Sequence, residues 1–129
     1  MASIFLSYSH ADEQFARGLT SALNGLGHRT WIGEEQIAYG DSLIDATQEA
    51  LRTSSAVVVL LTEASRNSQW VAFELGAATA QGKRIFPILL SEDPSVVPFQ
   101  LQRIQYLRAD PSDPADVART IAKALAGEA

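Results

Sequence analysis

The run SAVVVLLT, at residues 55–62, places six apolar side chains in succession. A β-strand that is covered by helices on both faces shows this unbroken pattern, whereas a strand with one face in water alternates apolar and polar residues. The run SIFLSY, at residues 3–8, lacks alternation as well. We therefore expect both segments to be central strands of a sheet that is buried on both sides.

Amphipathic stretches separate the apolar runs along the whole chain, and this order predicts a parallel sheet. Three more strands are expected at residues 28–33, 84–90 and 104–108, of which the last is the weakest. Pro87 has no backbone N–H to donate, so it favours an edge or irregular position within its run. The stretch 91–100 contains two prolines and predicts a surface loop or an irregular helix.

Two helices are predicted before the third strand. The first covers residues 11–24, begins with Ser9 and Asp12 as a capping box, and buries residues at helical spacing: Phe15, Leu19, Leu23 and Leu26. The second begins after Ser42, which forms a second candidate box with Asp45. It ends near residue 53, and its inward arc consists of Leu43, Ile44, Thr47, Ala50 and Leu51.

Two more helices are predicted after the third strand. The segment NSQWVAFELGAATAQ, at residues 67–81, reads as a helix that is apolar almost throughout. The last helix begins with Asp113 as N-cap and Pro114 in its first position. It buries Val117, Ile121 and Leu125.

Composition narrows the class of protein. With 129 residues, 47% of them hydrophobic, the chain suits one compact domain over residues 1–129. The formal net charge of −5 argues against a nucleic-acid partner, because phosphate binding needs clustered Lys and Arg. The chain has no Cys, which excludes thiolate catalysis and disulfides. The apolar runs are too short to span a bilayer of about 30 Å. The first residues do not resemble a signal peptide. We therefore expect a cytoplasmic protein with no membrane partner.

Glu74 is the one carboxylate in the apolar helix at residues 67–81. On a helix of 3.6 residues per turn it is surrounded by Trp70, Val71, Ala77 and Ala78. Burying a carboxylate without a partner is costly, so Glu74 must have a partner, a cleft or a raised pKa. Two structural alternatives stay open: Glu74 pairs with Arg84 or reaches solvent past the helix end, and Trp70 is plain core packing.

The position of this helix favours a ligand site. Because it follows the third strand, its start lies at the carboxyl edge of a parallel sheet, where open α/β sheets bind ligands. The first strand ends at the same edge and delivers Tyr8, Ser9 and His10. An aromatic ring, hydroxyl groups and the Glu74 carboxylate are therefore expected to converge on one crevice.

Three blocks of the sequence resemble conserved blocks of the Toll/interleukin-1 receptor (TIR) domain and come in the same order: IFLSYSHAD, ALRTSSAVVVLLTEAS and SQWVAFEL. The resemblance is closest to the bacterial branch of the family. The resemblance extends from residue 3 to about residue 125. It implies a flavodoxin-like, three-layer α/β fold with a five-stranded parallel sheet in the order 2-1-3-4-5 and helices on both faces. This architecture agrees with the pattern of strands and helices described above.

Many TIR domains cleave the bond between nicotinamide and ribose in NAD+. The resemblance therefore implies an NAD+ nucleosidase that releases nicotinamide and ADP-ribose, its cyclic form or a cyclic isomer, with NAD+ as substrate and no cofactor. The family's essential glutamate stands one helical turn after a tryptophan, and the matching positions here are Glu74 and Trp70. The resemblance further places four residues at the substrate: Tyr8, Ser9, His10 and Ser42.

Residues 33–41, GEEQIAYGD, correspond to the mobile BB loop of the family, which closes over the site and contacts a neighbouring subunit. The loop residues expected to act in closure and assembly are Gly33, Glu34, Ile37, Tyr39, Gly40 and Asp41. The sequence departs from the family pattern in this loop, where Tyr39-Gly40 replaces a common Pro-Gly, and on the later helix, where Val71 replaces a common cysteine. The resemblance also implies self-association, activation by clustering and a role in bacterial antiphage defence, with a fused or separate nucleotide-sensing domain as a candidate partner.

Other functions fit the sequence less well. The main alternative is a non-catalytic TIR adaptor that signals through assembly, and a nucleoside deoxyribosyltransferase ranks below it. A phosphoacceptor receiver is excluded because the third strand ends in LLT, without the Asp it requires. No metal site is expected, because His10 and His28 are far apart and fit no standard ligand spacing. Ser9 has no neighbouring base that would support a hydrolase triad.

Overall fold

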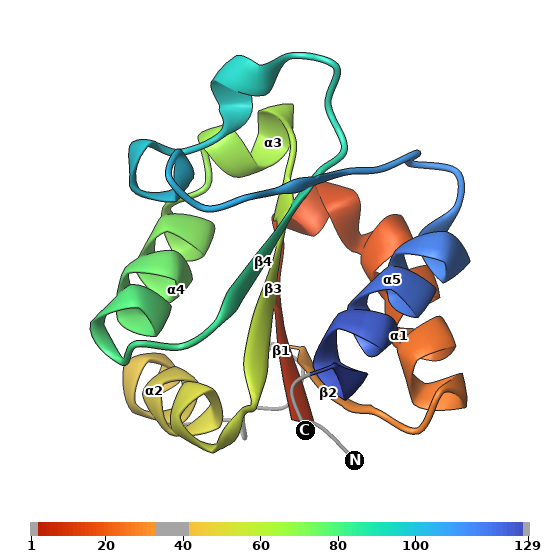
Figure 1. Ribbon diagram of the computed structural model, residues 1–129. Helices are drawn as coiled ribbons and strands as arrows, with labels where there is room; N and C mark the ends of the chain where they lie inside the picture. Colours follow the sequence, from red (N-terminus) through yellow and green to blue (C-terminus); the bar gives the residue numbers. More distant parts are fainter. Residues whose placement is uncertain (1–2, 33–41, 128–129) are drawn as a thin grey trace.

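The computed structural model describes residues 3–32 and 42–127 (Figure 1). Within these residues one five-stranded sheet has the order β2-β1-β3-β4-β5. All neighbouring strands run parallel, and their bounds are β1 (Ser3–Ser7), β2 (Arg29–Ile32), β3 (Ala56–Leu61), β4 (Ile85–Leu89) and β5 (Leu107–Arg108). The predicted fold class and strand order are confirmed.

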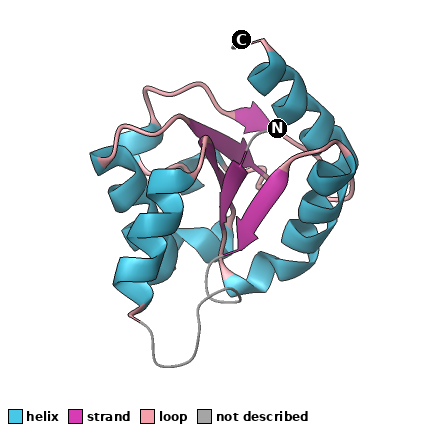
Figure 2. Ribbon diagram, turned by 90° about the horizontal axis from the view of Figure 1, so that it is seen from below, coloured by secondary structure: helices cyan, strands magenta, loops and turns pink. Residues whose placement is uncertain are grey.

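Helices cover both faces of the sheet. α1 (Glu13–Gly25) and α5 (Pro114–Ala126) lie on one face, and α2 (Leu43–Thr53) and α4 (Gln69–Ala80) lie on the other (Figure 1, Figure 2). Short helical turns occupy the connections: η1 (His10–Asp12), α3 (Glu63–Arg66), η3 (Pro94–Val96) and η4 (Phe99–Leu101). In the part of the chain that the structure describes, no helix combines the length and apolarity that a bilayer crossing requires.

The side chains of the central strands alternate between two apolar layers. Ile4 and Leu6 of β1 belong to the layer that includes α1 and α5. Phe5 belongs to the opposite layer, together with Leu75 and Ala78 of α4. Every residue of β3 is buried because helices meet it from both sides, and this explains its unbroken apolar run.

Pro87 lies in an inner strand, which corrects the expectation of an edge position. β4 pairs with β3 along its whole length, but its pairing with β5 begins only at Ile88. The Ala109 N–H donates to the Leu89 carbonyl, so Leu89 and, by alternation, Pro87 direct their backbone groups toward the β5 side. Because β5 starts opposite Ile88, the sheet requires no ladder bond from the Pro87 nitrogen.

Two apolar residues that helical spacing predicts to be inside are exposed. The exposed fraction is 47% for Leu26 and 55% for Ile44. α1 ends at Gly25, and Gly27 then adopts a φ of +90°, so Leu26 leaves the buried stripe of the helix. Ile44 lies in the first turn of α2, whereas Thr47, about one turn later, is buried.

The capping box predicted from Ser9 and Asp12 does not form. Ser9 precedes η1 without a side-chain capping bond, and α1 begins only after Asp12. The Asp12 carboxylate instead accepts a hydrogen bond from Thr62 Oγ1 at 2.6 Å, which ties η1 to the end of β3. At α2 the Ser42 half of the predicted box is present, because Ser42 Oγ accepts from the Asp45 N–H at 3.2 Å.

Candidate active site

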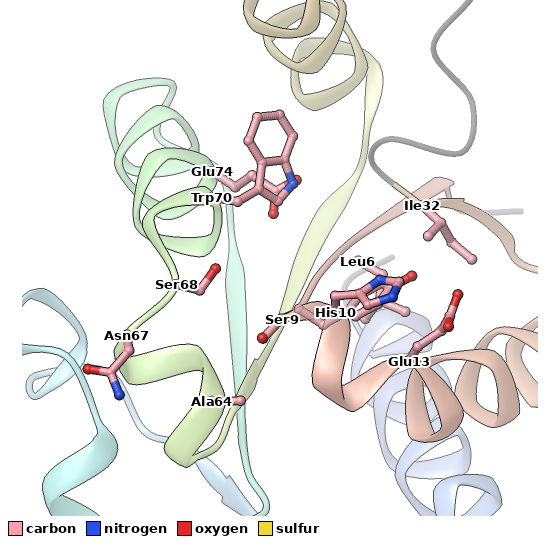
Figure 3. Close-up of a pocket in the computed structure, with 11 residues that line it drawn as sticks. Leu6, Ser9, His10, Glu13, Ile32, Ala64, Asn67, Ser68, Trp70 and Glu74 are labelled. Carbon is pink, nitrogen blue, oxygen red and sulfur yellow. The ribbon is translucent and has the colours of Figure 1, made fainter.

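A pocket of about 420 Å³ opens at the carboxyl edge of the sheet, between α4 and the connection from β1 to α1. Figure 3 shows Trp70 and Glu74 on the α4 side, with Ser9, His10 and Glu13 across from them. The topology explains this arrangement. β1 and β3 are adjacent strands, so the segments that follow them leave the sheet side by side.

Glu74 lies in the middle of α4 and is 1% exposed, although it contributes to the lining of the pocket. Its Oε1 accepts a hydrogen bond from the Ser7 hydroxyl at 2.8 Å. A buried carboxylate needs such a donor, because without hydrogen bonds its loss of hydration is costly. Of the three outcomes considered from the sequence, the structure provides a partner and a cleft.

The sequence of α4 determines which side of the helix carries the Glu74 side chain. Ser68 caps the helix, since its Oγ accepts from the Val71 N–H at 3.1 Å. Val71, Leu75 and Ala78 are buried in the apolar layer between α4 and the sheet. Glu74 precedes Leu75 and shares its buried side of the helix, so the packing of α4 carries the carboxylate to the end of β1.

Trp70 stands one turn before Glu74 and is half-buried. Its ring lies 5.4 Å from the ring of Phe73 in a tilted arrangement, measured between centroids. Trp70 also lines the pocket, so part of its ring is available to a ligand. An aromatic face beside a carboxylate favours a cationic group in the space between them.

Asp12 and Thr62 join the two segments that flank the pocket. Asp12 ends η1, which begins with His10, and Thr62 caps α3, which contributes Ala64 to the lining. Burial raises the pKa of the Asp12 carboxyl above its ordinary value, and the hydrogen bond from Thr62 opposes part of that rise. The hydrogen bond between Asp12 and Thr62 therefore holds the walls of the pocket together, although burial of the Asp12 carboxylate is unfavourable.

The pocket has an acidic lining. Glu13 and Glu74 both contribute to it, and no Lys or Arg occurs among its described lining residues. Glu13 is ion-paired with the exposed Arg17 at 2.9 Å. Across residues 3–32 and 42–127, no three His, Cys, Asp or Glu side chains gather into a group that could hold a metal ion. The charge of the lining favours a cationic reacting group over an anionic one.

Most of the residues that the sequence singled out come together here. Tyr8, Ser9 and His10 line the same pocket as Trp70 and Glu74. Arg84, the alternative partner considered for Glu74, has its guanidinium 4.6 Å over the Phe86 ring. The structure gives no evidence on the chemical roles of these residues, which stay predictions.

The remaining predictions concern Ser42 and the loop at residues 33–41. Ser42 is exposed, caps α2 and is not among the residues that line this pocket. The loop residues Gly33, Glu34, Ile37, Tyr39, Gly40 and Asp41 lie outside the described residues, so their roles in closure and assembly stay predictions.

Sequence reasoning missed Ser7. It reads as one residue of an apolar strand, and its bond to Glu74 spans 67 positions of sequence. The signal that pointed to it is its polarity, because Ser7 falls on the same face of β1 as the buried Phe5. A hydroxyl on that apolar face needs a partner, and α4 covers the face.

A family model described as the TIR domain matches residues 4–124. The chain belongs to the TIR domain family. Another member, the 2' cyclic ADP-D-ribose synthase AbTIR of Acinetobacter baumannii (strain 1295743), is 32% identical over 90 residues, which make up 66% of this chain and 34% of that protein. The present chain thus spans about a third of the length of this relative.

Solved TIR structures share the fold. The TIR domain of the Toll-related receptor TRR-2 from Hydra magnipapillata superposes with a TM-score of 0.78 at 19% identity, covering 99% of this chain and 98% of that one. The TIR domains of the activated Roq1 resistosome superpose with a TM-score of 0.65 at 22% identity, covering 96% of this chain and 72% of that one. At these identities the likeness concerns the fold.

Proposed function

We propose that this TIR domain cleaves the N-glycosidic bond between nicotinamide and ribose in NAD+, with Glu74 as the catalytic residue. The observation that carries the proposal is the Glu74 carboxylate, buried in a pocket at the carboxyl edge of the sheet and one helical turn from a half-exposed Trp70. The A. baumannii relative, a 2' cyclic ADP-D-ribose synthase, supports the same substrate class.

The proposed reaction requires only one carboxylate. When the C–N bond breaks, its electron pair goes to the pyridinium nitrogen, and nicotinamide leaves as a neutral molecule. Glycosidases that expel an alkoxide need a second carboxyl group to protonate the leaving oxygen. Here that proton is not needed, so the lining can be acidic without a separate proton donor.

Glu74 then acts on the ribose. Its carboxylate accepts hydrogen bonds from ribose hydroxyl groups and stabilises the positive charge that develops at the anomeric carbon. Trp70 offers an aromatic face to the departing nicotinamide or to the ribose cation. Attack by water gives ADP-ribose and releases a proton, whereas attack by a hydroxyl group of the same molecule gives a cyclic product. The name of the relative favours the cyclic outcome for this chain as well.

The proposal is tested by following NAD+ and its products with purified domain at high concentration. Wild type and Glu74→Gln are compared with Glu49→Gln, which changes an exposed carboxylate on α2 that is ion-paired with Arg52. We expect cleavage by wild type and Glu49→Gln and none by Glu74→Gln, with all three folded. Chromatography of the products distinguishes linear from cyclic ADP-ribose. If no NAD+ is consumed even when the domains are tethered together, the adaptor function takes precedence.

We further propose that clustering activates the domain, as expected for an effector in bacterial antiphage defence that is switched on by a fused or separate nucleotide-sensing partner. The resistosome relative, in which TIR domains belong to an activated assembly, supports this regulation. The rate per subunit should rise with concentration and on tethering to an oligomeric scaffold. A rate per subunit that stays flat in both experiments would contradict this part of the proposal.

A further inference from the structure

Ser7 is the last residue of β1, a central strand that lies between β2 and β3. It is opposite Val59 in the sheet and is 1% exposed. Its backbone is therefore paired with β3, the middle strand of the sheet. A hydroxyl group on a buried, paired strand has a more rigid support than one on a loop.

The direction of the Ser7 side chain follows from the alternation of the strand. Phe5, two residues earlier, packs in the apolar layer with Leu75 and Ala78 of α4, whereas Ile4 and Leu6 pack on the opposite face. Ser7 therefore faces α4. An aliphatic residue would pack better in this apolar layer. Burying the hydroxyl group costs desolvation free energy, so packing alone does not explain a serine at this position.

The hydroxyl group of Ser7 meets Glu74, because it donates to Oε1 at 2.8 Å in a fully buried hydrogen bond. A glutamate side chain has three rotatable bonds, and fixing them costs conformational entropy. A donor on a rigid strand selects one orientation of the carboxylate before any ligand arrives. An ionised carboxylate has roughly four acceptor positions, and Glu74 also lines the pocket where the ribose hydroxyl groups would bind.

We infer that Ser7 is a positioning residue, whose hydroxyl group orients the Glu74 carboxylate for cleavage of the glycosidic bond. The inference rests on the proposed function, because it assigns Ser7 a role in that reaction. Ser7 does not itself reach the substrate in this scheme. It contributes by holding Glu74 in the geometry that stabilises positive charge on the ribose, and such preorganisation acts on the rate more than on substrate binding.

A purely structural role would also place a hydroxyl group at this point, to satisfy a buried carboxylate. The two roles differ in what they predict for kinetics. Loss of a structural bond lowers the melting temperature and leaves kcat unchanged in the molecules that remain folded. Loss of a positioning bond lowers kcat, while KM stays near the wild-type value.

The chain offers a matched control in Ser54. This serine is also buried, and its Oγ donates to the Ala50 carbonyl at 2.6 Å, at the far end of α2. Ser54→Ala therefore deletes a buried, hydrogen-bonded hydroxyl group without touching the pocket. Any effect of Ser7→Ala that Ser54→Ala does not reproduce comes from the place of Ser7 beside Glu74.

The test compares NAD+ cleavage by wild type, Ser7→Ala, Ser7→Thr and Ser54→Ala, all well below their melting temperatures. We expect Ser7→Ala to lower kcat about 10- to 100-fold, with KM changed by less than about threefold. Ser7→Thr keeps the hydroxyl group and should recover most of the rate, and Ser54→Ala should match wild type in kcat.

The outcomes separate this inference from the function on which it rests. If wild type does not cleave NAD+, the proposed function fails. If wild type cleaves NAD+ and Ser7→Ala does so with an unchanged kcat, Ser7 has no positioning role and the proposed function stands. A Ser7→Thr variant that folds but is as slow as Ser7→Ala would also overturn the inference. If Ser7→Thr does not fold, the comparison of Ser7→Ala with Ser54→Ala decides.

Discussion

Replacing Ser7 and Glu74 together by apolar residues is expected to give a protein that is inactive and more stable than wild type. Both side chains are 1% exposed, so both polar groups lose their hydration on folding. The hydrogen bond of 2.8 Å between them compensates only part of that loss. A catalytic carboxylate kept in such surroundings is retained at the expense of stability.

The magnitudes follow from which partner is removed. Ser7→Ala alone deletes a hydrogen bond to a charged, buried acceptor and should destabilise by about 1.5 to 3 kcal/mol. The double variant Ser7→Ala/Glu74→Met also removes the acceptor, and Met fills a similar volume, so a gain of about 1 to 3 kcal/mol over wild type is expected. For 129 residues, 1 kcal/mol corresponds to roughly 4 °C in melting temperature.

Thermal unfolding followed by circular dichroism at neutral pH measures these shifts. The single variant should melt roughly 6 to 12 °C below wild type, and the double variant roughly 4 to 12 °C above it. Glu49→Met, at an exposed position on α2, is the control and should melt close to the wild-type temperature. A double variant less stable than Ser7→Ala would refute the reasoning, because the carboxylate would then be stabilising in its own right.

Two further predictions concern the walls of the pocket. Burial raises the pKa of Asp12, so Asp12 binds more protons in the folded than in the unfolded chain. The free energy of unfolding therefore falls as pH rises from the ordinary Asp pKa through the raised pKa of the folded state. Asn keeps an acceptor for Thr62, so Asp12→Asn should melt at or above the wild-type temperature near neutral pH. The difference between the two melting temperatures should vanish below about pH 3. A lower melting temperature of Asp12→Asn at neutral pH would contradict this prediction. Trp70→Ala should lower kcat/KM for NAD+ at least about tenfold, whereas Trp70→Phe, which keeps an aromatic face, should lose much less. Equal losses in the two Trp70 variants would show that the ring face has no part in the reaction.

The arrangement of strands and helices could be predicted because it depends on patterns that are local in sequence. The unbroken run of β3 and the helical spacing of Phe15, Leu19 and Leu23 each reflect burial on a known face. Exceptions arose where the partner was not local. Pro87 is accommodated within an inner strand because β5 is short, and the length of β5 depends on a segment far along the chain.

Short elements and hydrogen bonds at the site were harder to predict. α3 has only four residues and is stabilised by a reciprocal capping box between Thr62 and Ser65. No periodic pattern of apolar residues predicts so short a helix. Asp12 was expected to form a capping box with Ser9, but its carboxylate instead accepts a hydrogen bond from Thr62, 50 positions away. The bond from Ser7 to Glu74 is likewise a product of the tertiary fold.

The candidate site could be predicted in part from topology alone. Parallel strands end at one edge, so Tyr8, Ser9 and His10 had to emerge beside the helix that carries Trp70 and Glu74. From its apolar surroundings in the sequence, Glu74 was expected to have a partner, a cleft or a raised pKa. Which residue would be the partner was not foreseen, because that depends on the rotation of α4 against β1.

The most direct test of the central claim is the release of nicotinamide from NAD+ by concentrated or tethered wild-type domain, with Glu74→Gln and Glu49→Gln measured beside it. Our account predicts that wild type and Glu49→Gln release nicotinamide and that folded Glu74→Gln does not. Release by Glu74→Gln at the wild-type rate would contradict the assignment of Glu74. No release by any of the three would contradict the proposed NAD+ cleavage itself.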